Sequence, residues 1–141
     1  MIHRAFLVAV CGVILIAGCP AGSPAGEQPS LQATAWTLTA LGSGGNMRPA
    51  LETADVTIEF DADEVSGSAG CNLYFGSYSA RKDGTFLVDN VAWTEMACLK
   101  PGVMEQEQQF LNTLLQAKSY DVSDDTLTIG GGGGSLVFAP Q

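Results

Sequence analysis

The sequence is poor in histidine. Its single histidine is His3, close to the N-terminus, so the chain downstream of that position has none. Catalytic serines and cysteines commonly depend on a histidine base, and many zinc sites depend on histidine ligands. The composition therefore excludes Ser-His-Asp triads, Cys-His pairs and histidine-based zinc sites from any folded domain, and we expect no enzyme activity and no cofactor.

Basic residues are also scarce. The chain has six lysines and arginines against fifteen aspartates and glutamates, and one of the six, Arg4, lies in the N-terminal leader described below. An acidic surface of this kind repels nucleic acid phosphates and anionic lipid headgroups. Nucleic acid is therefore not an expected partner, and we interpret the acidic surface as a means of staying soluble beside a membrane.

Long apolar runs are limited to one, Ala5–Ile16, which follows a short positive segment as in a secretory signal peptide. As a helix this run would measure about 18 Å, against about 30 Å for the hydrocarbon core of a bilayer. We therefore expect residues 1–18 to be a cleaved signal peptide rather than a transmembrane anchor.

The predicted cleavage site, Ile16-Ala17-Gly18-Cys19, resembles the bacterial lipobox, in which the cysteine receives a diacylglyceryl group. Acyl chains on Cys19 would hold the mature protein in the cell envelope, anchored to the lipid bilayer. An ordinary signal peptide with an incidental cysteine is the alternative. Pro20 stands where many inner-membrane lipoproteins have aspartate, which favours the outer membrane, facing the periplasm, in a Gram-negative organism.

The mature chain divides into two parts. Residues 19–34 are rich in proline, glycine and small residues and show no hydrophobic periodicity, which predicts a flexible linker. Residues 35–141 have the length of one domain with a modest core, and we expect it to be monomeric.

Cysteine usage predicts a disulfide. Cys11 lies in the leader and Cys19 is the expected lipidation site, which leaves Cys71 and Cys98 as a pair in a chain sent to an oxidising compartment. We predict that these two are bonded, at a gain of about 3 to 4 kcal/mol in the chain-entropy model. Two buried free thiols are the alternative.

Most of the domain is predicted to form strands, because apolar and polar residues alternate with a period of two. The expected strands cover residues 36–41, 56–60, 65–69, 73–78, 85–88, 91–96, 119–122, 126–129 and 136–139. Gly130–Gly134 predicts a flexible hairpin loop whose glycines supply positive φ angles. It does not match a phosphate-binding loop, because no Gly-Lys-Ser/Thr ends it and no helix follows.

One amphipathic helix is predicted after Pro101-Gly102. Its core-facing residues recur at spacings of three and four, whereas glutamines and an asparagine occupy the other face. The core-facing set is Val103, Glu107, Phe110, Leu111, Leu114 and Leu115, and the polar set is Gln106, Gln108, Gln109, Asn112 and Gln116. We interpret Glu105 and Glu107 as complementing the helix dipole, with Lys118 at the helix end.

The acidic turn Asp61–Glu64 is not expected to bind calcium. Counted with Asp61 as the first position, the twelfth position is Asn72 rather than glutamate, and the sixth position is not glycine. A solvated turn is the preferred interpretation, so no metal site is predicted.

Three motifs together resemble the META domain of HslJ-like heat-shock lipoproteins. They are Gly70-Cys71-Asn72 with Gly76 and Tyr78, Thr94-Glu95-Met96-Ala97-Cys98, and Met104-Glu105-Gln106-Glu107 with Phe110 and Leu114. Trp36-Thr37-Leu38 and Leu136-Val137-Phe138 resemble the bounding strands, so the resemblance covers the chain from Ala35 onward. The five-glycine run is a departure from the family pattern.

The resemblance implies a compact α+β domain, in which a small curved antiparallel sheet approaches a barrel and one packed helix closes one side. It also implies an envelope protein associated with stress or antibiotic tolerance, in a family without an established catalytic activity.

The motif residues are interpreted as a structural staple, with a ligand site as the alternative. Gly70 and Gly76 would let the backbone bend or approach closely, and Asn72 would satisfy backbone groups with its amide. Tyr78 and Thr94 would supply hydroxyls to buried backbone, and Met96 belongs to the same motif.

Three functions follow as hypotheses. The first is a non-enzymatic interaction module that binds an envelope protein through its exposed sheet face or loops. The second is a small-ligand-binding barrel with Trp93, Phe75 and Tyr74 at its mouth. The third, a redox enzyme cycling Cys71 and Cys98, is disfavoured because the two do not form a Cys-X-X-Cys motif.

Overall fold

The strands of this protein form one antiparallel sheet. The computed structural model describes residues 26–141, so the predicted signal peptide and Cys19 lie outside the described residues. One helix, α1 (Val103–Leu115), stands between the sixth and seventh strands. The strands are β1 (Thr34–Ser43), β2 (Asn46–Pro49), β3 (Thr57–Asp61), β4 (Glu64–Ser68), β5 (Leu73–Ala80), β6 (Phe86–Trp93), β7 (Ala117–Ser123), β8 (Thr126–Gly131) and β9 (Gly134–Pro140).

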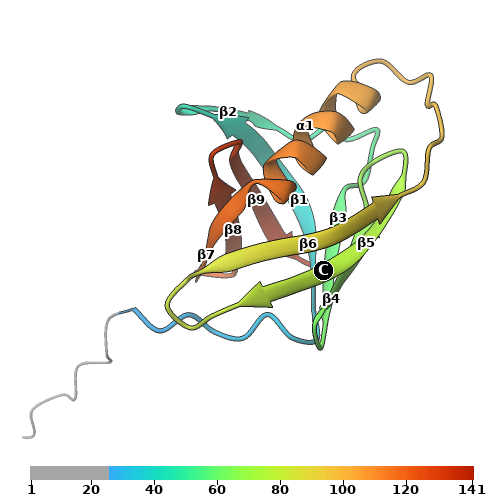
Figure 1. The fold of residues 1–141 in the computed structure, drawn as a ribbon. Coiled ribbons are helices and arrows are strands. Elements are labelled where there is room, and N and C mark those ends of the chain that lie inside the picture. The colour runs from blue at the N-terminus through green and yellow to red at the C-terminus, as the bar shows by residue number, and fades with distance from the viewer. Residues whose placement is uncertain (1–25) are drawn as a thin grey trace, which may run out of the picture.

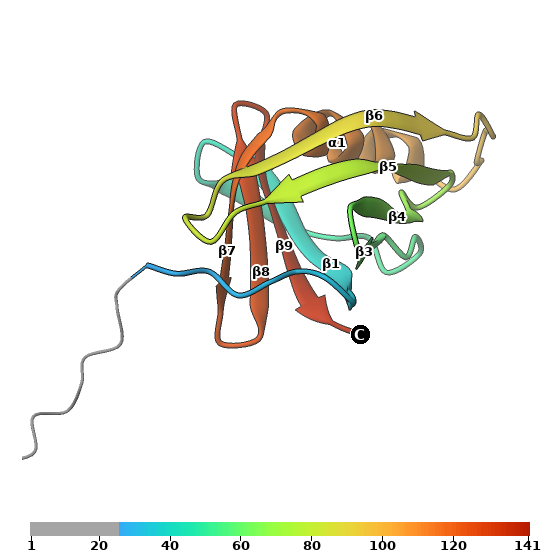
Figure 2. The ribbon, with the colours of Figure 1, turned by 60° about the horizontal axis from the view of Figure 1, so that its bottom comes forward.

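The sheet curls into a half-barrel. Eight strands follow the order β6-β5-β4-β3-β1-β9-β8-β7, and β2 pairs with β1 off this path. The two ends of the path meet at one corner, where Thr85 bridges to Ser119 and the Tyr120 N–H donates to the Gly84 carbonyl at 2.8 Å. Figures 1 and 2 show α1 packed against this curled sheet. The predicted α+β class, a curved antiparallel sheet with a single helix, is confirmed.

The core lies inside the curl, because alternate residues of each strand point inward. At one end, Phe60 packs against Tyr78 with ring centroids 4.8 Å apart, and Phe86 contacts both rings. Beneath the helix, Phe110 lies between Tyr74, at 5.5 Å, and Phe138, at 6.5 Å. The helix therefore completes the core with its own aromatic ring.

The helix begins after Gly102, whose φ of +79° is left-handed. Its boundaries and polarity differ from the prediction in three respects. Gln106, expected on the polar face, is fully buried and accepts the Leu51 N–H through Oε1 at 2.9 Å. Leu115, expected to face the core, is 41% exposed, and Lys118 belongs to β7 instead of the helix end.

Strand β6 merges two predicted strands across an irregularity. The β5–β6 register shifts between Phe75 and Ser77, so that Asn90 and Val91 lie opposite Gly76 alone. Asn90 takes a φ of +53°, which asparagine tolerates better than most residues. This is a β-bulge. The sequence pattern had split the strand because the bulge interrupts the period of two.

The described part of the predicted linker is packed against the domain. The Gln28 N–H donates to the Lys82 carbonyl at 2.7 Å, and Gln28 Oε1 accepts the Val122 N–H at 2.8 Å. Leu31 is only 1% exposed and belongs to the core. The packed chain therefore begins before residue 35, where the sequence had placed the start of the domain.

The glycine run forms the predicted hairpin, with most of its residues paired in the two strands. Gly131 pairs with Gly134, which leaves two residues at the turn. Of the five glycines, only Gly134 has a positive φ, at +129°. A Cβ on Gly131 would overlap the Gln116 carbonyl and one on Gly134 would overlap the Gly42 carbonyl, so close backbone packing is what requires glycine there.

No helix within residues 26–141 is long and apolar enough to cross a membrane.

Candidate functional site

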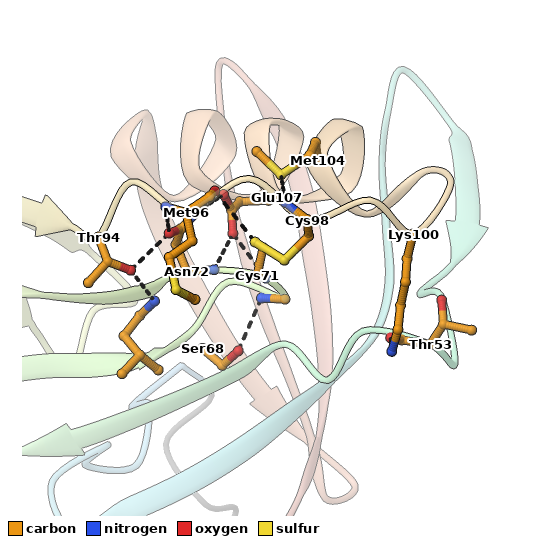
Figure 3. Close-up of a disulfide and its surroundings, with 12 residues drawn as sticks. Thr53, Ser68, Cys71, Asn72, Thr94, Met96, Cys98, Lys100, Met104 and Glu107 are labelled. Carbon is orange, nitrogen blue, oxygen red and sulfur yellow. Dashed lines mark hydrogen bonds between the residues drawn. A yellow bond between two sulfur atoms is a disulfide. The ribbon is translucent and has the colours of Figure 1, made fainter.

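The predicted disulfide between Cys71 and Cys98 is present. Its sulfur atoms are 2.05 Å apart and its Cα atoms 5.9 Å apart. The bond joins the turn before β5 to the segment that connects β6 with α1 (Figure 3). The disulfide prediction is confirmed, and the bond lies at the centre of the motif residues.

Asn72 forms the centre of a hydrogen-bond network beside the disulfide. Its side-chain Nδ2 donates to the Met96 carbonyl at 3.1 Å and to Glu107 Oε1 at 2.6 Å. Its Oδ1 accepts the Thr94 hydroxyl at 2.9 Å and the Met96 N–H at 2.6 Å. Asn72 is only 3% exposed, and these contacts use both donors and both acceptor positions of its amide.

Glu107 joins this network from the helix (Figure 3). One carboxylate oxygen accepts the backbone N–H groups of Cys71, at 3.1 Å, and of Asn72, at 2.7 Å. The side chain is buried. Hydrogen bonds to a carboxylate are stronger than those between neutral groups, so Glu107 fixes the turn to the helix.

Glu107 is the site residue whose role the sequence did not reveal. We had interpreted it as complementing the helix dipole, but its carboxylate points at the Cys71–Asn72 turn. A signal was present, because Glu107 shares the spacing of Val103 and Phe110 on the core-facing side of the helix. An acidic residue at a core-facing position needs hydrogen-bond partners, and here they are backbone N–H groups.

Three more motif residues adjoin Asn72. Thr94 Oγ1 accepts the Leu73 N–H at 3.1 Å, as expected of a hydroxyl that reaches backbone. Met96 contributes its backbone groups, whereas its side chain is 58% exposed. Gly70 has a φ of +111°, and a Cβ there would lie 3.3 Å from that of Ala54, so both strain and space favour glycine.

Gly76 and Tyr78 lie further along β5, outside this network. A Cβ on Gly76 would approach the Asp89 carbonyl to 3.0 Å, so Gly76 permits the bulge opposite it. Tyr78 packs its ring on Phe60 and Phe86. The hydroxyl that reaches buried backbone belongs to Tyr74, which donates to the Thr57 carbonyl at 2.8 Å.

Tyr74 remains a hydrogen-bond donor at neutral pH. Burial raises the pKa of its hydroxyl well above the usual value, and the nearby charge of Glu59 raises it further. A raised pKa keeps the proton on the oxygen, as the bond to the Thr57 carbonyl requires. Tyr74 is therefore a core residue.

A groove lies between the end of β6 and the helix. It has a volume of about 370 Å³ and is lined by Trp93 together with residues of α1. The helical residues are Met104, Glu105, Glu107, Gln108, Leu111, Asn112 and Leu115. Two of them are acidic and none is basic, so the groove has a negative electrostatic character.

The three aromatic residues predicted for a ligand mouth do not come together. Trp93 lines the groove, but Tyr74 is buried and only 1% exposed. Phe75 neighbours Tyr74 in β5 and therefore points to the opposite face of the sheet, where it is 61% exposed. In residues 26–141, no three His, Cys, Asp or Glu side chains are placed to hold a metal ion.

Solved structures resemble this fold. An NMR structure of a protein from Burkholderia xenovorans matches with a TM-score of 0.69 and 26% identity, over 92% of this chain and 99% of the other. A second NMR structure matches with a TM-score of 0.62 and 23% identity, over 77% and 90%. A crystal structure of a DUF4847 family protein from Bacteroides vulgatus shares the fold, with a TM-score of 0.54 and 17% identity over 77% and 93%.

No curated protein matches the chain. The model of the META domain family matches residues 29–141, which include the strands, the helix and every residue of the Asn72 network. The match also begins close to Gln28, where packing against the domain begins. The chain therefore belongs to the META domain family.

Proposed function

We propose that this META domain protein is a membrane-anchored, non-enzymatic interaction module of the cell envelope, with a role in stress or antibiotic tolerance. The anchor is supported by the leader and by the lipobox-like sequence ending in Cys19. The role in tolerance follows the resemblance to HslJ-like lipoproteins. The interaction is supported by the surface described next.

Large apolar side chains are exposed at one end of the molecule, on both faces of the sheet. The observation that carries the proposal is this group, here called the apolar tip, which comes from the start of β5, the end of β6 and the segment before α1. Its members are Leu73, Phe75, Trp93, Met96 and Leu99, with exposures of 62%, 61%, 43%, 58% and 98%. Single exposed apolar residues are ordinary, but a group of them marks an interaction surface.

The apolar tip is held in place by the site described above. The Cys71–Cys98 bond and the Asn72 network connect its three segments to one another and to the helix. A surface ordered before binding loses less conformational entropy when a partner arrives. The disulfide and the Asn72 network thus support the proposed interaction by preorganising the surface.

The apolar tip lies on the side of the molecule away from the proposed N-terminal anchor. In Figures 1 and 2 the end of β6 and the following segment lie at the opposite end of the molecule from the start of the described chain, drawn in blue. An anchor upstream of that segment would leave the tip facing away from the bilayer. A protein partner, rather than lipid, is therefore the expected ligand.

Binding of a small molecule is the second candidate, and the groove beside Trp93 favours it. Its volume of about 370 Å³ lies at the lower end of the range for small-ligand sites, about 300 to 1,000 Å³. Tryptophan fluorescence in the presence of hydrophobic small molecules tests this candidate. A response at micromolar concentrations would favour it over the interaction module.

Two measurements test the main proposal. Metabolic labelling with a fatty-acid analogue should mark the wild-type protein and not the Cys19→Ser variant, and an unmarked wild type would overturn the anchor. A photo-crosslinking residue at Phe75 in intact cells should capture one protein partner. The same residue at Asp124, in the exposed turn between β7 and β8, is the control. Equal capture from both positions would overturn the apolar tip as the interface.

A further inference from the structure

The helix carries a second apolar stripe that the core covers only at Leu111. Met104, Leu111 and Leu115 follow one another at helical spacing, with Gln108 between the first two. Met104 is 36% exposed and Leu115 is 41% exposed. This stripe forms one wall of the groove described above, and Trp93 at the end of β6 belongs to the other wall. An apolar helix face therefore lies open beside a strand.

That strand, β6, lies at one edge of the sheet. β6 pairs with β5 on one side, and the backbone of β7 bridges to Gly84 and Thr85, before β6 begins. The remaining length of β6 lies next to α1. An edge strand presents backbone donors and acceptors to which another extended chain can add.

The register gives the direction of these backbone groups near Trp93. The Thr94 N–H donates to the Leu73 carbonyl at 3.0 Å and the Leu73 N–H donates to the Thr94 hydroxyl at 3.1 Å, so Thr94 occupies a hydrogen-bonding position opposite Leu73. Hydrogen-bonded and non-hydrogen-bonded pairs alternate along an antiparallel ladder. The next pair, Tyr74 and Trp93, is therefore non-hydrogen-bonded, and the N–H and C=O of Trp93 point away from β5.

The charges around the groove select the partner. Glu105 and Glu107 line it, and no lysine or arginine does. A second copy of this chain would bring a like net charge, and anionic lipid would be repelled in the same way. A segment carrying basic residues would be attracted.

From these observations we propose that the groove between β6 and α1 binds an extended segment of a partner protein in which apolar residues alternate with lysine or arginine. The segment adds to the edge of β6, with its apolar side chains on Trp93, Leu111 and Leu115 and its basic side chains near Glu105. This inference rests on the proposed function, because it gives the interaction module its binding site and the chemistry of its partner.

The test is an NMR titration of the ¹⁵N-labelled full-length chain with two synthetic peptides, one alternating valine with lysine and the other alternating valine with glutamate. The lysine peptide at millimolar concentration should shift the amides of β6, the indole N–H of Trp93 and the amides of the α1 stripe. The glutamate peptide should leave them in place. No shift with either peptide, or equal shifts with both, would overturn the inference.

Two matched variants locate the site. Leu115→Arg places a positive charge at an exposed position in the groove and should weaken binding of the lysine peptide about tenfold or more. Met47→Arg places the same charge at a similarly exposed position in β2, outside the groove, and should leave the affinity unchanged. Equal weakening by both variants would contradict the assignment.

The two proposals fail in different ways. If the lysine peptide does not bind while the crosslinker at Phe75 still captures a partner, the interaction module stands and the groove is not its site. If neither occurs, both proposals fail.

Discussion

Asn72 and Glu107 are 35 residues apart in the sequence, and Glu107 accepts both the backbone N–H of Asn72, at 2.7 Å, and its Nδ2 group, at 2.6 Å. Through this pair the turn before β5 is attached directly to the second turn of α1. The Cys71–Cys98 bond links the same turn to the chain just before the helix. The two connections place β5, β6 and α1 in one rigid arrangement, and the predictions below test each part of it.

Replacement of Cys98 by serine should lower the stability of the protein by about 3 to 4 kcal/mol. The bond closes a loop with a sequence separation of 27, and its loss enlarges the conformational entropy of the unfolded chain. Thermal unfolding followed by circular dichroism measures the change. Leu99→Ser, at a neighbouring position that is 98% exposed, is the control and should unfold like the wild type. An unchanged melting curve for Cys98→Ser would refute the structural role of the bond.

Glu107→Gln should destabilise the protein by about 2 kcal/mol. A glutamine retains one acceptor oxygen, so its NH₂ group must face donor N–H groups of Asn72 or Cys71 and leave buried donors unpaired. Urea unfolding gives the difference. Glu105→Gln removes an equal charge at an exposed position in the first turn of the same helix and should change the stability by less than about 0.5 kcal/mol. If the two substitutions changed the stability equally, the role of Glu107 would be limited to complementing the helix dipole.

Asn72→Asp should be destabilising at neutral pH and partly recover in acid. The substitution places a carboxylate oxygen where Nδ2 now lies 2.6 Å from the carboxylate of Glu107. Two carboxylates this close repel each other until one of them is protonated. The stability deficit relative to the wild type should therefore shrink as the pH falls from about 7 to about 4. Asn72→Ala cannot titrate, and its deficit should stay constant over this range.

The stability of the wild-type protein should fall above about pH 10, partly because of Tyr74. Burial raises the pKa of this hydroxyl in the folded state, so above the unfolded pKa the unfolded chain loses a proton that the folded chain keeps. By linkage, unfolding is then favoured as the pH rises. Urea midpoints between about pH 8 and pH 11 measure the slope. Tyr74→Phe should be less stable at neutral pH, through loss of the bond to Thr57, yet show a shallower alkaline decline.

Gly131→Ala should destabilise the protein by more than about 2 kcal/mol, because the added Cβ would overlap the carbonyl of Gln116. Gly132→Ala should be tolerated, since the nearest atom to its Cβ would be Gln116 Oε1 at 3.7 Å. Differential scanning calorimetry of the two variants separates these outcomes. If both variants melt alike, the glycine run serves flexibility rather than close packing.

Local patterns in the sequence were sufficient for much of the fold. The alternation in residues 56–60 matches β3, where Ile58 and Phe60 are buried and Glu59 is exposed. The spacing of Phe110 and Leu114 predicted the helix face that enters the core. These patterns are reliable because burial on one side of a strand or helix imposes its own period on the chain.

The same patterns could not identify partners that lie far apart. Nothing in the helical spacing shows that Glu107 meets the turn at Asn72, or that Leu115 leaves the core to line a groove with Trp93. β2 has no alternation to reveal it, and the packing of Leu31 depends on the surface that the folded sheet offers. Each of these features is a long-range contact, which a local pattern does not encode.

The sequence by itself determined the class of fold and the META family motifs, and it predicted the disulfide that the structure contains. The tertiary structure alone decided what the motif does: it brought Asn72, Glu107 and Met96 together, and it left Trp93 and one side of α1 uncovered. The physical reason is that burial periodicity is local, whereas hydrogen-bond partners and open surfaces exist only once the strands and the helix have packed.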